Sequence, residues 1–384
     1  MKVGLYVEDF APTLGGGYVL REDVAKAALE LTGRHEIELV RASSVAGALG
    51  PSGLRGKLRT LMRGKRSRDE SMKHVESDIR GRGIQMLWFN HLEPIAVDIP
   101  YILNIFDLQH RLQPWFPEVS AKGLWDHREA TWANAARRAS IVTVGSEEAK
   151  EQLSFFYGVP LGNIRVVPFP TPRAALDAAS KSSALPVDAE AVKAKYGIKG
   201  EFLFYPAQFW PHKNHVNLLH ALRRLHRDHR MPLSLVLTGS DQGSLAYVRV
   251  VAEQLGLTPH VHFLGFVPHE DVIAFYRSAF ALSYVSFFGP ENLPPLEAMA
   301  LGCPVVLSDI PGVRTLFGDA PVLVNPRSEA SIADAIRWLH DDPDQRCQRA
   351  KAGKEIATRN TPEKYVRSIH AILDDFEPLR RCWP

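Results

Sequence analysis

Residues 287–305, FFGPENLPPLEAMALGCPV, combine side chains and a chain pattern that suit binding of a phosphate beside a hydroxyl. A glycine-containing loop leads into Pro294 and Pro295, which fit the first turn of a helix because no N–H is needed there. The positive end of a helix dipole attracts anions. Glu297 follows one turn inside the helix, where a carboxylate reaches a sugar or ribose hydroxyl. We therefore predict a nucleotide-sugar site here, with an ordinary loop, helix and strand of an α/β protein as the alternative.

A second segment of this kind covers residues 202–215, FLFYPAQFWPHKNH. An apolar strand ends in a loop that carries Gln208, His212 and Lys213, and a helix is expected to begin next. A lysine at the carboxyl end of a strand, beside a helix start, is well placed to bind a diphosphate. A solvated loop lysine is the alternative.

The elements that must position these residues are strands and helices in alternation. Short apolar runs alternate with helical patterns along the whole chain, which is typical of parallel sheets built from β–α–β units. The expected strands are 3–7, 37–42, 84–89, 101–106, 141–145, 164–169, 202–207, 233–239, 261–266, 280–285, 304–308 and 321–324. Ligands of parallel sheets bind at the carboxyl ends of strands, so the loops of the second half are expected to converge on one edge.

The strands divide into two sets of equal size, and each set suffices for a Rossmann-like sheet. We expect an N-terminal, acceptor-binding Rossmann-like domain over residues 1–170 and a linker over 171–195, which is rich in Ala, Ser and Pro. A nucleotide-sugar-binding domain is expected over 196–360, and a final helix over 361–384 that returns toward the first domain. The fold class is therefore α/β, with two parallel-sheet domains that face a cleft.

Composition restricts the class of protein further. The chain has 384 residues, 45% hydrophobic and 23% charged, as expected for a globular protein of about two domains. Its formal net charge of +3 gives no support for a nucleic-acid partner. The three cysteines have no metal-binding spacing, which favours a reducing cytoplasm. We see neither a signal-peptide pattern nor an apolar run of the roughly 20 residues that a membrane span needs, so any membrane contact should be peripheral.

With these motifs in place, nearly the whole chain resembles the retaining GT-B glycosyltransferases of family 4, glycosyl transferases group 1, including bacterial mannosyltransferases. The resemblance is strongest in FYPAQFWPHKNHVNLL, VHFLGFV and FFGPENLPPLEAMALGCPVV. It implies a nucleoside diphosphate sugar as donor. The donor contacts that it implies are Lys213 for the diphosphate; Asn292 and Leu293 for the phosphates; Glu297 for the ribose; and Phe266 and Val267 for the nucleobase. Gln208 and His212, in the same loop as Lys213, are our further candidates for the diphosphate.

Two positions depart from the family pattern. The family's E-x7-E motif would place its first Glu eight residues before Glu297, where Gly289 stands. Glu291, six residues before Glu297, is our candidate to replace it, with a solvent-facing Glu as the alternative. The family's basic partner of Lys213 is also missing, and Gln208 at that place brings hydrogen bonds but no charge.

The first half of the chain supplies further candidates. Gly16 and Gly17 follow the first strand and let the backbone approach a ligand closely. The resemblance implies that this loop faces the donor phosphates, whereas a simple turn is the alternative. The glycines do not form G-x-G-x-x-G, so dinucleotide binding and a dehydrogenase activity are poorly supported.

The fourth strand is followed by FDLQHR, residues 106–111. In the resembled family a His-Asp pair ends this strand, but Phe106 occupies the histidine position here. His110 is our candidate to accept a proton or bind the sugar, because a neutral imidazole accepts a hydroxyl proton. Asp107 is expected to orient His110 or to cap the loop. His91 and Glu93 are second-rank candidates at the same edge.

A basic stretch over residues 54–68, LRGKLRTLMRGKRSR, places apolar residues at helical spacing. A basic amphipathic helix is typical of contact with an anionic membrane surface. We therefore expect a peripheral contact with the inner face of the membrane. A solvated helix without a membrane role is the alternative.

Together these observations predict transfer of a hexosyl group, with a preference for mannosyl from GDP-mannose, to a hydroxyl of a glycan or lipid-linked glycan acceptor. The resemblance implies retention of anomeric configuration, and neither a metal nor another cofactor is expected. Asp342 and Asp344 spell D-x-D but lie in a polar segment away from the strand-end loops, so we expect helix capping. The alternatives are a non-catalytic sugar-nucleotide-binding or scaffold subunit and a nucleotide-sugar 2-epimerase of the same two-domain layout.

Overall fold

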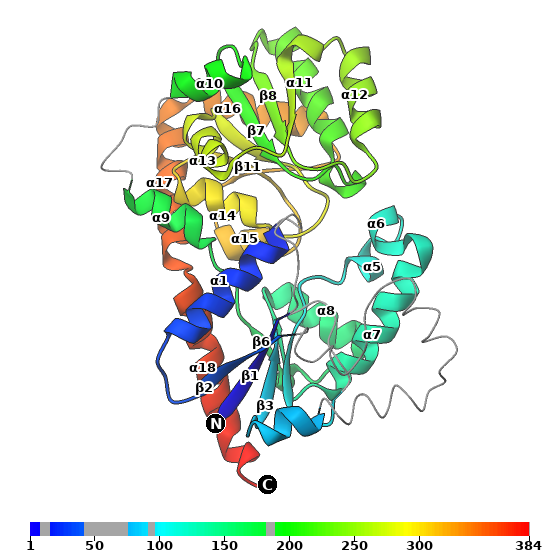
Figure 1. Cartoon of the computed structure of the whole chain (residues 1–384). Helices are drawn as coiled ribbons and strands as arrows, with labels where there is room; N and C mark the ends of the chain where they lie inside the picture. Colours follow the sequence, from blue (N-terminus) through cyan, green and yellow to red (C-terminus); the bar gives the residue numbers. More distant parts are fainter. Residues whose placement is uncertain (8–15, 42–75, 91–96, 182–188, 384) are drawn as a thin grey trace. The chain divides into compact units, whose positions relative to one another are not determined.

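The structure, a computed structural model, describes residues 1–7, 16–41, 76–90, 97–181 and 189–383. The chain divides into two compact units, each with a six-stranded sheet of described residues (Figure 1). Unit 1 comprises Met1–Leu108, Trp125–Pro168 and Pro362–Pro384. Unit 2 comprises Gln109–Leu124 and Phe169–Thr361. We call residues 109–124 the docking segment, because it belongs to unit 2 although the chain on either side of it belongs to unit 1.

The sheet of unit 1 has the order β2-β1-β3-β4-β5-β6, and every pairing is parallel. Its strands are β1 Lys2–Val7, β2 Glu36–Arg41, β3 Met86–Phe89, β4 Tyr101–Asn104, β5 Ile141–Val144 and β6 Ile164–Val166. All residues of β3, β4 and β5 are buried. Helices cover both faces of such a sheet, which explains why the inner strands are continuous apolar runs rather than alternating patterns.

The sheet of unit 2 has the order β12-β11-β10-β7-β8-β9, again entirely parallel. Its strands are β7 Phe202–Pro206, β8 Ser234–Thr238, β9 Val261–Gly265, β10 Ala281–Tyr284, β11 Val305–Ser308 and β12 Val322–Val324. The chain proceeds outward from β7 on one side and from β10 on the other. The strand order therefore reverses between β10 and β7, and parallel sheets bind ligands at the carboxyl ends of the strands beside such a reversal. All the strands expected from the sequence are confirmed.

The labelled helices flank these sheets (Figure 1). They are α1 Gly16–Glu30, α5 Gln109–Leu112, α6 Pro117–Ser120, α7 Leu124–Arg138, α8 Glu147–Tyr157, α9 Arg173–Lys181, α10 Ala189–Tyr196, α11 His215–His229, α12 Leu245–Gln254, α13 His269–Ser278, α14 Leu293–Ala300, α15 Val313–Phe317, α16 Glu329–Asp341, α17 Pro343–Arg359 and α18 Pro362–Arg380. The Asp342 carboxylate accepts a hydrogen bond from Gln345 N at 3.0 Å and so caps α17. The expectation that this D-x-D caps a helix is confirmed.

Residues 171–195 are mostly helical where described, instead of forming an extended linker. They contain α9 and most of α10, and Ala175 and Val192 from these helices belong to the core of unit 2. Composition was a poor guide here because Ala and Lys, which are common in linkers, are also good helix formers. The docking segment, expected in the first domain, has its contacts in unit 2, and α18 belongs to unit 1.

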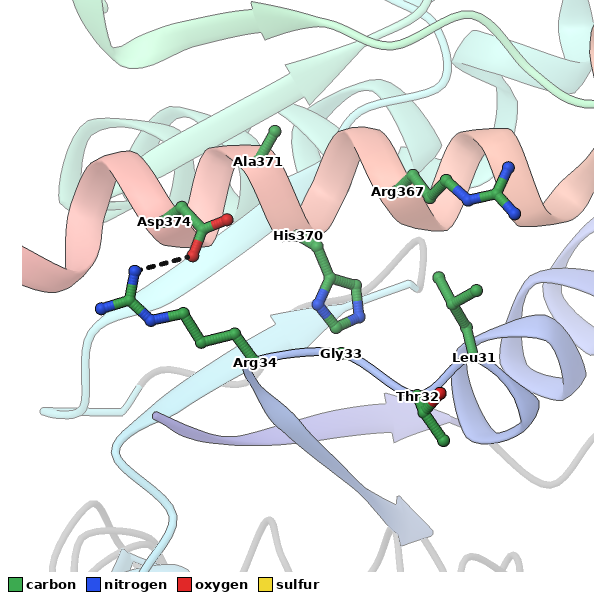
Figure 2. A pocket seen from close by; sticks show the side chains of 8 residues that line it. All are labelled: Leu31, Thr32, Gly33, Arg34, Arg367, His370, Ala371 and Asp374. Atoms are coloured by element: carbon green, nitrogen blue, oxygen red, sulfur yellow. Dashed lines mark ion pairs between the residues drawn. The ribbon is translucent and has the colours of Figure 1, made fainter.

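Helix α18 is fastened to the N-terminal part of unit 1 by charged groups. His35 Nε2 lies 3.0 Å from Asp374 Oδ1, and Arg34 Nη2 lies 2.7 Å from Glu377 Oε2. The backbone approaches α18 so closely that a Cβ at Gly33 would lie 2.7 Å from the His370 ring. A pocket of about 250 Å³ lies between α18 and the turn that follows α1, and Figure 2 shows the side chains that line it. Its lining is Leu31, Thr32, Gly33, Arg34, Arg367, His370, Ala371 and Asp374.

Some of the residues singled out in the sequence lie outside the part of the chain that the structure describes. The basic segment 54–68, with its proposed membrane contact, lies outside the described residues, as do His91 and Glu93. Among the described residues, we find no helix with both the length and the apolar character needed to cross a bilayer.

Candidate functional site

The loop after β7 is held against the end of β10 at the point where the strand order of unit 2 reverses. Asn214 adopts a left-handed backbone conformation with φ 61°. Its side-chain amide donates hydrogen bonds to Val285 O at 2.8 Å and to Pro326 O at 2.7 Å. Asn tolerates this backbone conformation better than most residues. The loop is thereby fixed so that Lys213, the preceding residue, lies at the carboxyl edge of the sheet.

Lys213 is oriented by two neutral oxygen atoms. Its Nζ donates to Tyr284 Oη and to Asn292 Oδ1, each at 2.9 Å. The Tyr284 hydroxyl donates in turn to Asn292 Oδ1 at 3.1 Å. Burial, with a further contribution from the Glu297 charge, raises the pKa of Tyr284, so this hydroxyl keeps its proton. These two hydrogen bonds fix the position of the ammonium group at the strand end, and an ammonium group there suits recognition of an anion.

The N-terminus of α14 meets this lysine. Asn292 is the N-cap residue, with φ −61° and ψ 137°, and its side chain makes no capping hydrogen bond because it binds Lys213 instead. Leu293 is buried at the first helical position. Pro294 and Pro295 carry no N–H, so Leu293 is the first-turn residue ahead of them that has one to offer to an anion. The N-terminus of α14 thus offers fewer N–H donors than that of an ordinary helix. Attraction of an anion to this site therefore depends more on the charge of Lys213.

Glu297 lies one turn inside α14. Its Oε2 accepts a hydrogen bond from the Tyr276 hydroxyl at 2.7 Å. Burial and then the Glu297 charge raise the pKa of Tyr276 well above its usual value. Because the Glu297 charge also acts on Tyr284, the carboxylate and Lys213 share one neighbourhood. A cation and a carboxylate therefore occur together here, and their roles in binding phosphates and hydroxyls stay predictions.

This geometry lies within the stretch of the chain that matches a known family. Residues 188–356 match the family described as glycosyl transferases group 1. This part of the chain, which we call the glycosyltransferase domain, is therefore similar to the group 1 glycosyltransferases. It contains Lys213, Tyr284, Asn292 and Glu297, which form the cluster just described.

Curated relatives of the glycosyltransferase domain include two bacterial enzymes. O-antigen chain mannosyltransferase B of Escherichia coli is 31% identical over 159 residues, which are 41% of this chain and 42% of that protein. D-inositol 3-phosphate glycosyltransferase of Corynebacterium urealyticum is 30% identical over 161 residues, 40% of this chain and 38% of that protein. The chain thus spans about two fifths of the length of these relatives.

Among solved structures, HepE of Anabaena in complex with UDP and glucose has a TM-score of 0.73. It is 18% identical, and the match covers 98% of this chain and 100% of that chain. This likeness is one of fold. Together with the two parallel six-stranded sheets, it establishes the GT-B fold class that the sequence predicted.

The glycosyltransferase domain has a glycine where the family motif would have its first Glu, and the backbone explains why. Gly289 has φ +85°, which favours glycine. A Cβ at this position would lie 2.5 Å from Asn292 Nδ2. A Glu at position 289 would therefore strain the loop that holds Asn292 against Lys213.

Glu291, the candidate replacement, is half-buried. It lies beside the backbone of Phe169, where the second segment of unit 2 begins. Its Oε1 accepts a hydrogen bond from Phe169 N at 3.4 Å. Burial raises the pKa of the carboxyl to about 8, although the Phe169 N–H acts in the opposite direction. At pH 7 the Glu291 side chain is therefore mainly protonated and able to donate a hydrogen bond.

Gln208 uses its amide group within the loop. The Nε2 atom donates to Ser240 Oγ at 3.1 Å, and Oε1 accepts from Trp210 Nε1 at 3.0 Å. These contacts join the loops after β7 and β8 of the glycosyltransferase domain. The amide NH₂ group has a second hydrogen to donate, so the predicted diphosphate contact of Gln208 stays a prediction.

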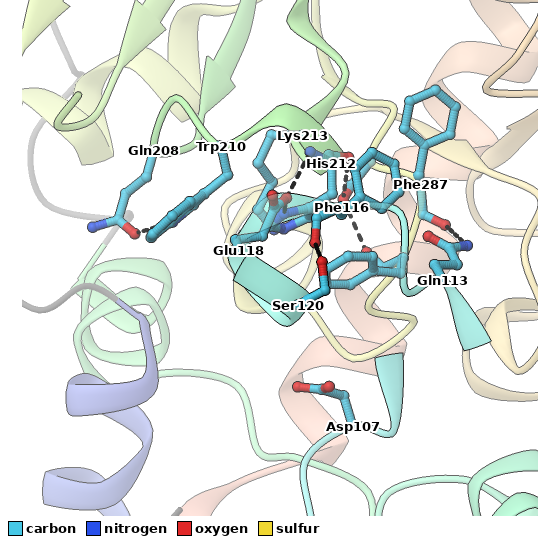
Figure 3. A network of polar contacts seen from close by, with 12 residues as sticks. Asp107, Gln113, Phe116, Glu118, Ser120, Gln208, Trp210, His212, Lys213 and Phe287 are labelled. Atoms are coloured by element: carbon cyan, nitrogen blue, oxygen red, sulfur yellow. Dashed lines mark hydrogen bonds and ion pairs between the residues drawn. The ribbon is translucent and has the colours of Figure 1, made fainter. Parts of the chain in front are cut away.

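His212 is bound by the docking segment (Figure 3). The Glu118 carboxylate accepts a hydrogen bond from His212 N at 2.9 Å and also contacts His212 Nδ1. The His212 ring lies flat on Phe288, with ring centroids 3.9 Å apart and an angle of 10°. One ring nitrogen of His212 is thus engaged by Glu118, so a diphosphate contact would fall to the other.

The predicted nucleobase residues follow β9. Phe266 is 67% exposed, so its ring can stack on a ligand. Val267, in contrast, packs against the core of unit 2. The chain turns between β9 and these residues at Gly265, which has φ +66°.

The candidates from the first half of the sequence are divided between the units. Gly16 and Gly17 begin α1 in unit 1, and Asp107 of unit 1 accepts a hydrogen bond from Arg128 Nη1 at 3.2 Å. His110 belongs to unit 2, where it is completely buried in α5. The predicted proton acceptor is thus an interior side chain of the docking segment rather than an exposed loop residue.

Sequence reasoning missed Tyr284, Tyr276, Glu118 and Phe288. Tyr284 ends β10, and the rule that ligands meet the carboxyl ends of strands could have identified it. Glu118 is 94 positions from His212, and no local pattern predicts this pairing.

Proposed function

We propose that the protein is a retaining glycosyltransferase that moves a hexosyl group, preferentially mannosyl, from a nucleoside diphosphate sugar to a hydroxyl of a glycan or lipid-linked glycan. The observation that carries this proposal is the cluster of Lys213, Tyr284 and Asn292 beside Glu297, at the strand-order reversal of the glycosyltransferase domain. The mannosyl preference draws on the named activity of the Escherichia coli relative.

In the proposed reaction the bond between the anomeric carbon and the diphosphate oxygen breaks, and a bond to the acceptor oxygen forms on the same face. The acceptor proton passes to the departing phosphate oxygen. Lys213 and the N-terminus of α14 stabilise the negative charge that develops on the diphosphate. Because this stabilisation comes from groups of the chain itself, the proposed reaction is independent of a metal and of any cofactor other than the donor.

The remaining predicted residues have roles within this proposal. Gly16 and Gly17 would approach the phosphates, and His110, Asp107 and Glu291 would act at the sugar and the acceptor hydroxyl. Each of these assignments is a prediction that mutation tests. Location in the cytoplasm, with a peripheral membrane contact that would bring the enzyme to a lipid-linked acceptor, likewise remains a prediction.

Calorimetric binding of GDP-mannose, UDP-glucose, UDP-GlcNAc and dTDP-rhamnose tests the proposal directly. We expect one donor to bind, and Lys213→Ala and Glu297→Ala each to weaken its binding by about tenfold or more, because each removes a charged hydrogen-bonding group. Lys351→Ala is the control, since Lys351 is exposed on α17. Slow hydrolysis of the bound donor would then distinguish a transferase from a scaffold. Failure of all four donors to bind, or equal binding by the Lys213 and Lys351 variants, would contradict the proposal.

A further inference from the structure

The docking segment brings the carboxylate of Glu118 to His212, in the loop before Lys213. The side chains of Glu118 and His212 are 5% and 8% exposed, respectively. One carboxylate oxygen, Oε1, serves both the backbone N–H and the Nδ1 atom of His212. Both contacts of Glu118 with His212 are therefore made by the same carboxylate oxygen.

The other carboxylate oxygen, Oε2, is buried, and the described residues give it no hydrogen bond. Burial raises the pKa of Glu118, but the hydrogen bonds from His212 outweigh it and lower the pKa overall, so the carboxylate stays ionised. A buried charged oxygen without a donor is costly. Its occurrence indicates a hydrogen-bond donor that the described chain does not supply.

The surroundings favour a hydroxyl as that donor. Phe288 stacks on the His212 ring, and Phe116 meets Phe288 edge-on with ring centroids 6.0 Å apart. Lys213 directly follows His212 in the chain, and Figure 3 shows Phe116 and His212 beside Glu118. An ionised carboxylate accepts hydrogen bonds only and repels phosphate oxygens. A few polar atoms among aromatic rings are typical of a site that fixes the orientation of a small ligand.

We propose that Glu118 Oε2 accepts a hydrogen bond from a hydroxyl of the donor's sugar, and that Glu118 thereby contributes to selection of that sugar. This inference rests on the proposed function of the site. Residue 118 lies outside the stretch 188–356 that matches the family. Recognition of the sugar is thus supplied in part by the docking segment, whereas recognition of the diphosphate comes from the glycosyltransferase domain.

The variant Glu118→Gln separates this role from structural support. Its carbonyl oxygen keeps both acceptor contacts with His212, and those contacts orient the amide so that an NH₂ group replaces Oε2. The atom that takes the place of Oε2 then changes from an acceptor to a donor with little change in shape. We expect binding of the nucleotide sugar that wild type prefers to weaken by about tenfold or more, since hydrogen bonds to charged groups are the strong ones. Binding of the corresponding nucleoside diphosphate, which lacks the sugar, should be unchanged.

Calorimetry with the wild type, Glu118→Gln and the control Glu270→Gln, an exposed position on α13, gives these affinities. Unchanged binding of the nucleotide sugar by Glu118→Gln overturns the inference. Equal losses for the nucleoside diphosphate and its sugar also overturn it, because they indicate support of the Lys213 loop alone. If the wild type binds neither compound, the proposed function itself fails, and that result differs from both others.

A second measurement does not depend on the folding of the variant. Donors that lack one sugar hydroxyl at a time are compared on the wild type. We expect one deletion to weaken binding by about tenfold and to have little further effect in Glu118→Gln, because both changes remove the same hydrogen bond. If every deoxy donor binds the wild type as well as the parent donor does, Glu118 makes no such contact.

Discussion

Replacement of Glu291 by Gln should stabilise the protein increasingly as the pH rises. Burial raises the pKa of this carboxyl from its ordinary value of 4.5 to about 8. The proton on Glu291 therefore favours the folded chain fully below about pH 4.5, and this contribution is lost as the pH rises through about 8. Gln has no proton to lose, and its carbonyl oxygen can still accept the hydrogen bond from Phe169 N.

The size of the effect follows from the two pKa values. One pKa unit corresponds to about 1.4 kcal/mol. The wild type should thus lose about 3 kcal/mol of unfolding free energy relative to Glu291→Gln between pH 5 and pH 8. This is an upper limit, because Glu291 is only half-buried as a residue and water screens part of the interaction. Since about 1 kcal/mol corresponds to roughly 2–4 °C in a domain of this size, the melting temperatures should diverge by about 5–10 °C.

The assay is thermal unfolding of both proteins at pH 5, 6, 7 and 8 in one buffer series of constant ionic strength. Glu270→Gln, at an exposed position on α13, controls for removal of a surface carboxylate. Its curve should run parallel to that of the wild type. The reasoning is refuted if the Glu291→Gln curve is also parallel to wild type, or if this variant loses relative stability as the pH rises.

Two further substitutions test the geometry around the lysine. Tyr284→Phe removes a hydroxyl that orients Lys213 and should weaken nucleoside diphosphate binding by about fivefold, as measured by calorimetry; Tyr247→Phe, at a position 62% exposed, should bind like wild type. Gly289→Ala places a Cβ at φ +85°, against the side-chain amide of the N-cap residue of α14. It should lower the unfolding free energy by about 1–3 kcal/mol in denaturant titrations, whereas Gly162→Ala, with open space around its Cβ, should have little effect.

The sequence by itself determined the strands and which side chains stand at their ends. Continuous apolar runs of four to six residues between turn residues are typical of strands buried between helices, and their order along the chain indicates parallel sheets. Lys213 and Glu297 were identifiable because each stands at a fixed place relative to a strand end or a helix start. These are short-range relations, and short-range relations are visible in the order of residues.

Helix and linker compositions overlap, which limited the same reasoning at residues 171–195. Alanine and lysine are common in both, and the core position of Val192 depends on what packs against α10. The docking segment poses the same problem, because its assignment to unit 2 follows from partners that are distant in sequence.

Tertiary structure alone decided which carboxylates are available and in what charge state. Glu291 looked like the replacement for the missing motif residue because of its spacing, yet its surroundings raise its pKa to about 8. Glu118 showed no signal, yet the fold brings it to His212 and leaves one of its oxygens unsatisfied among the described residues. Burial and hydrogen bonding set the charge of a carboxyl group, and both are properties of neighbours that only folding assembles.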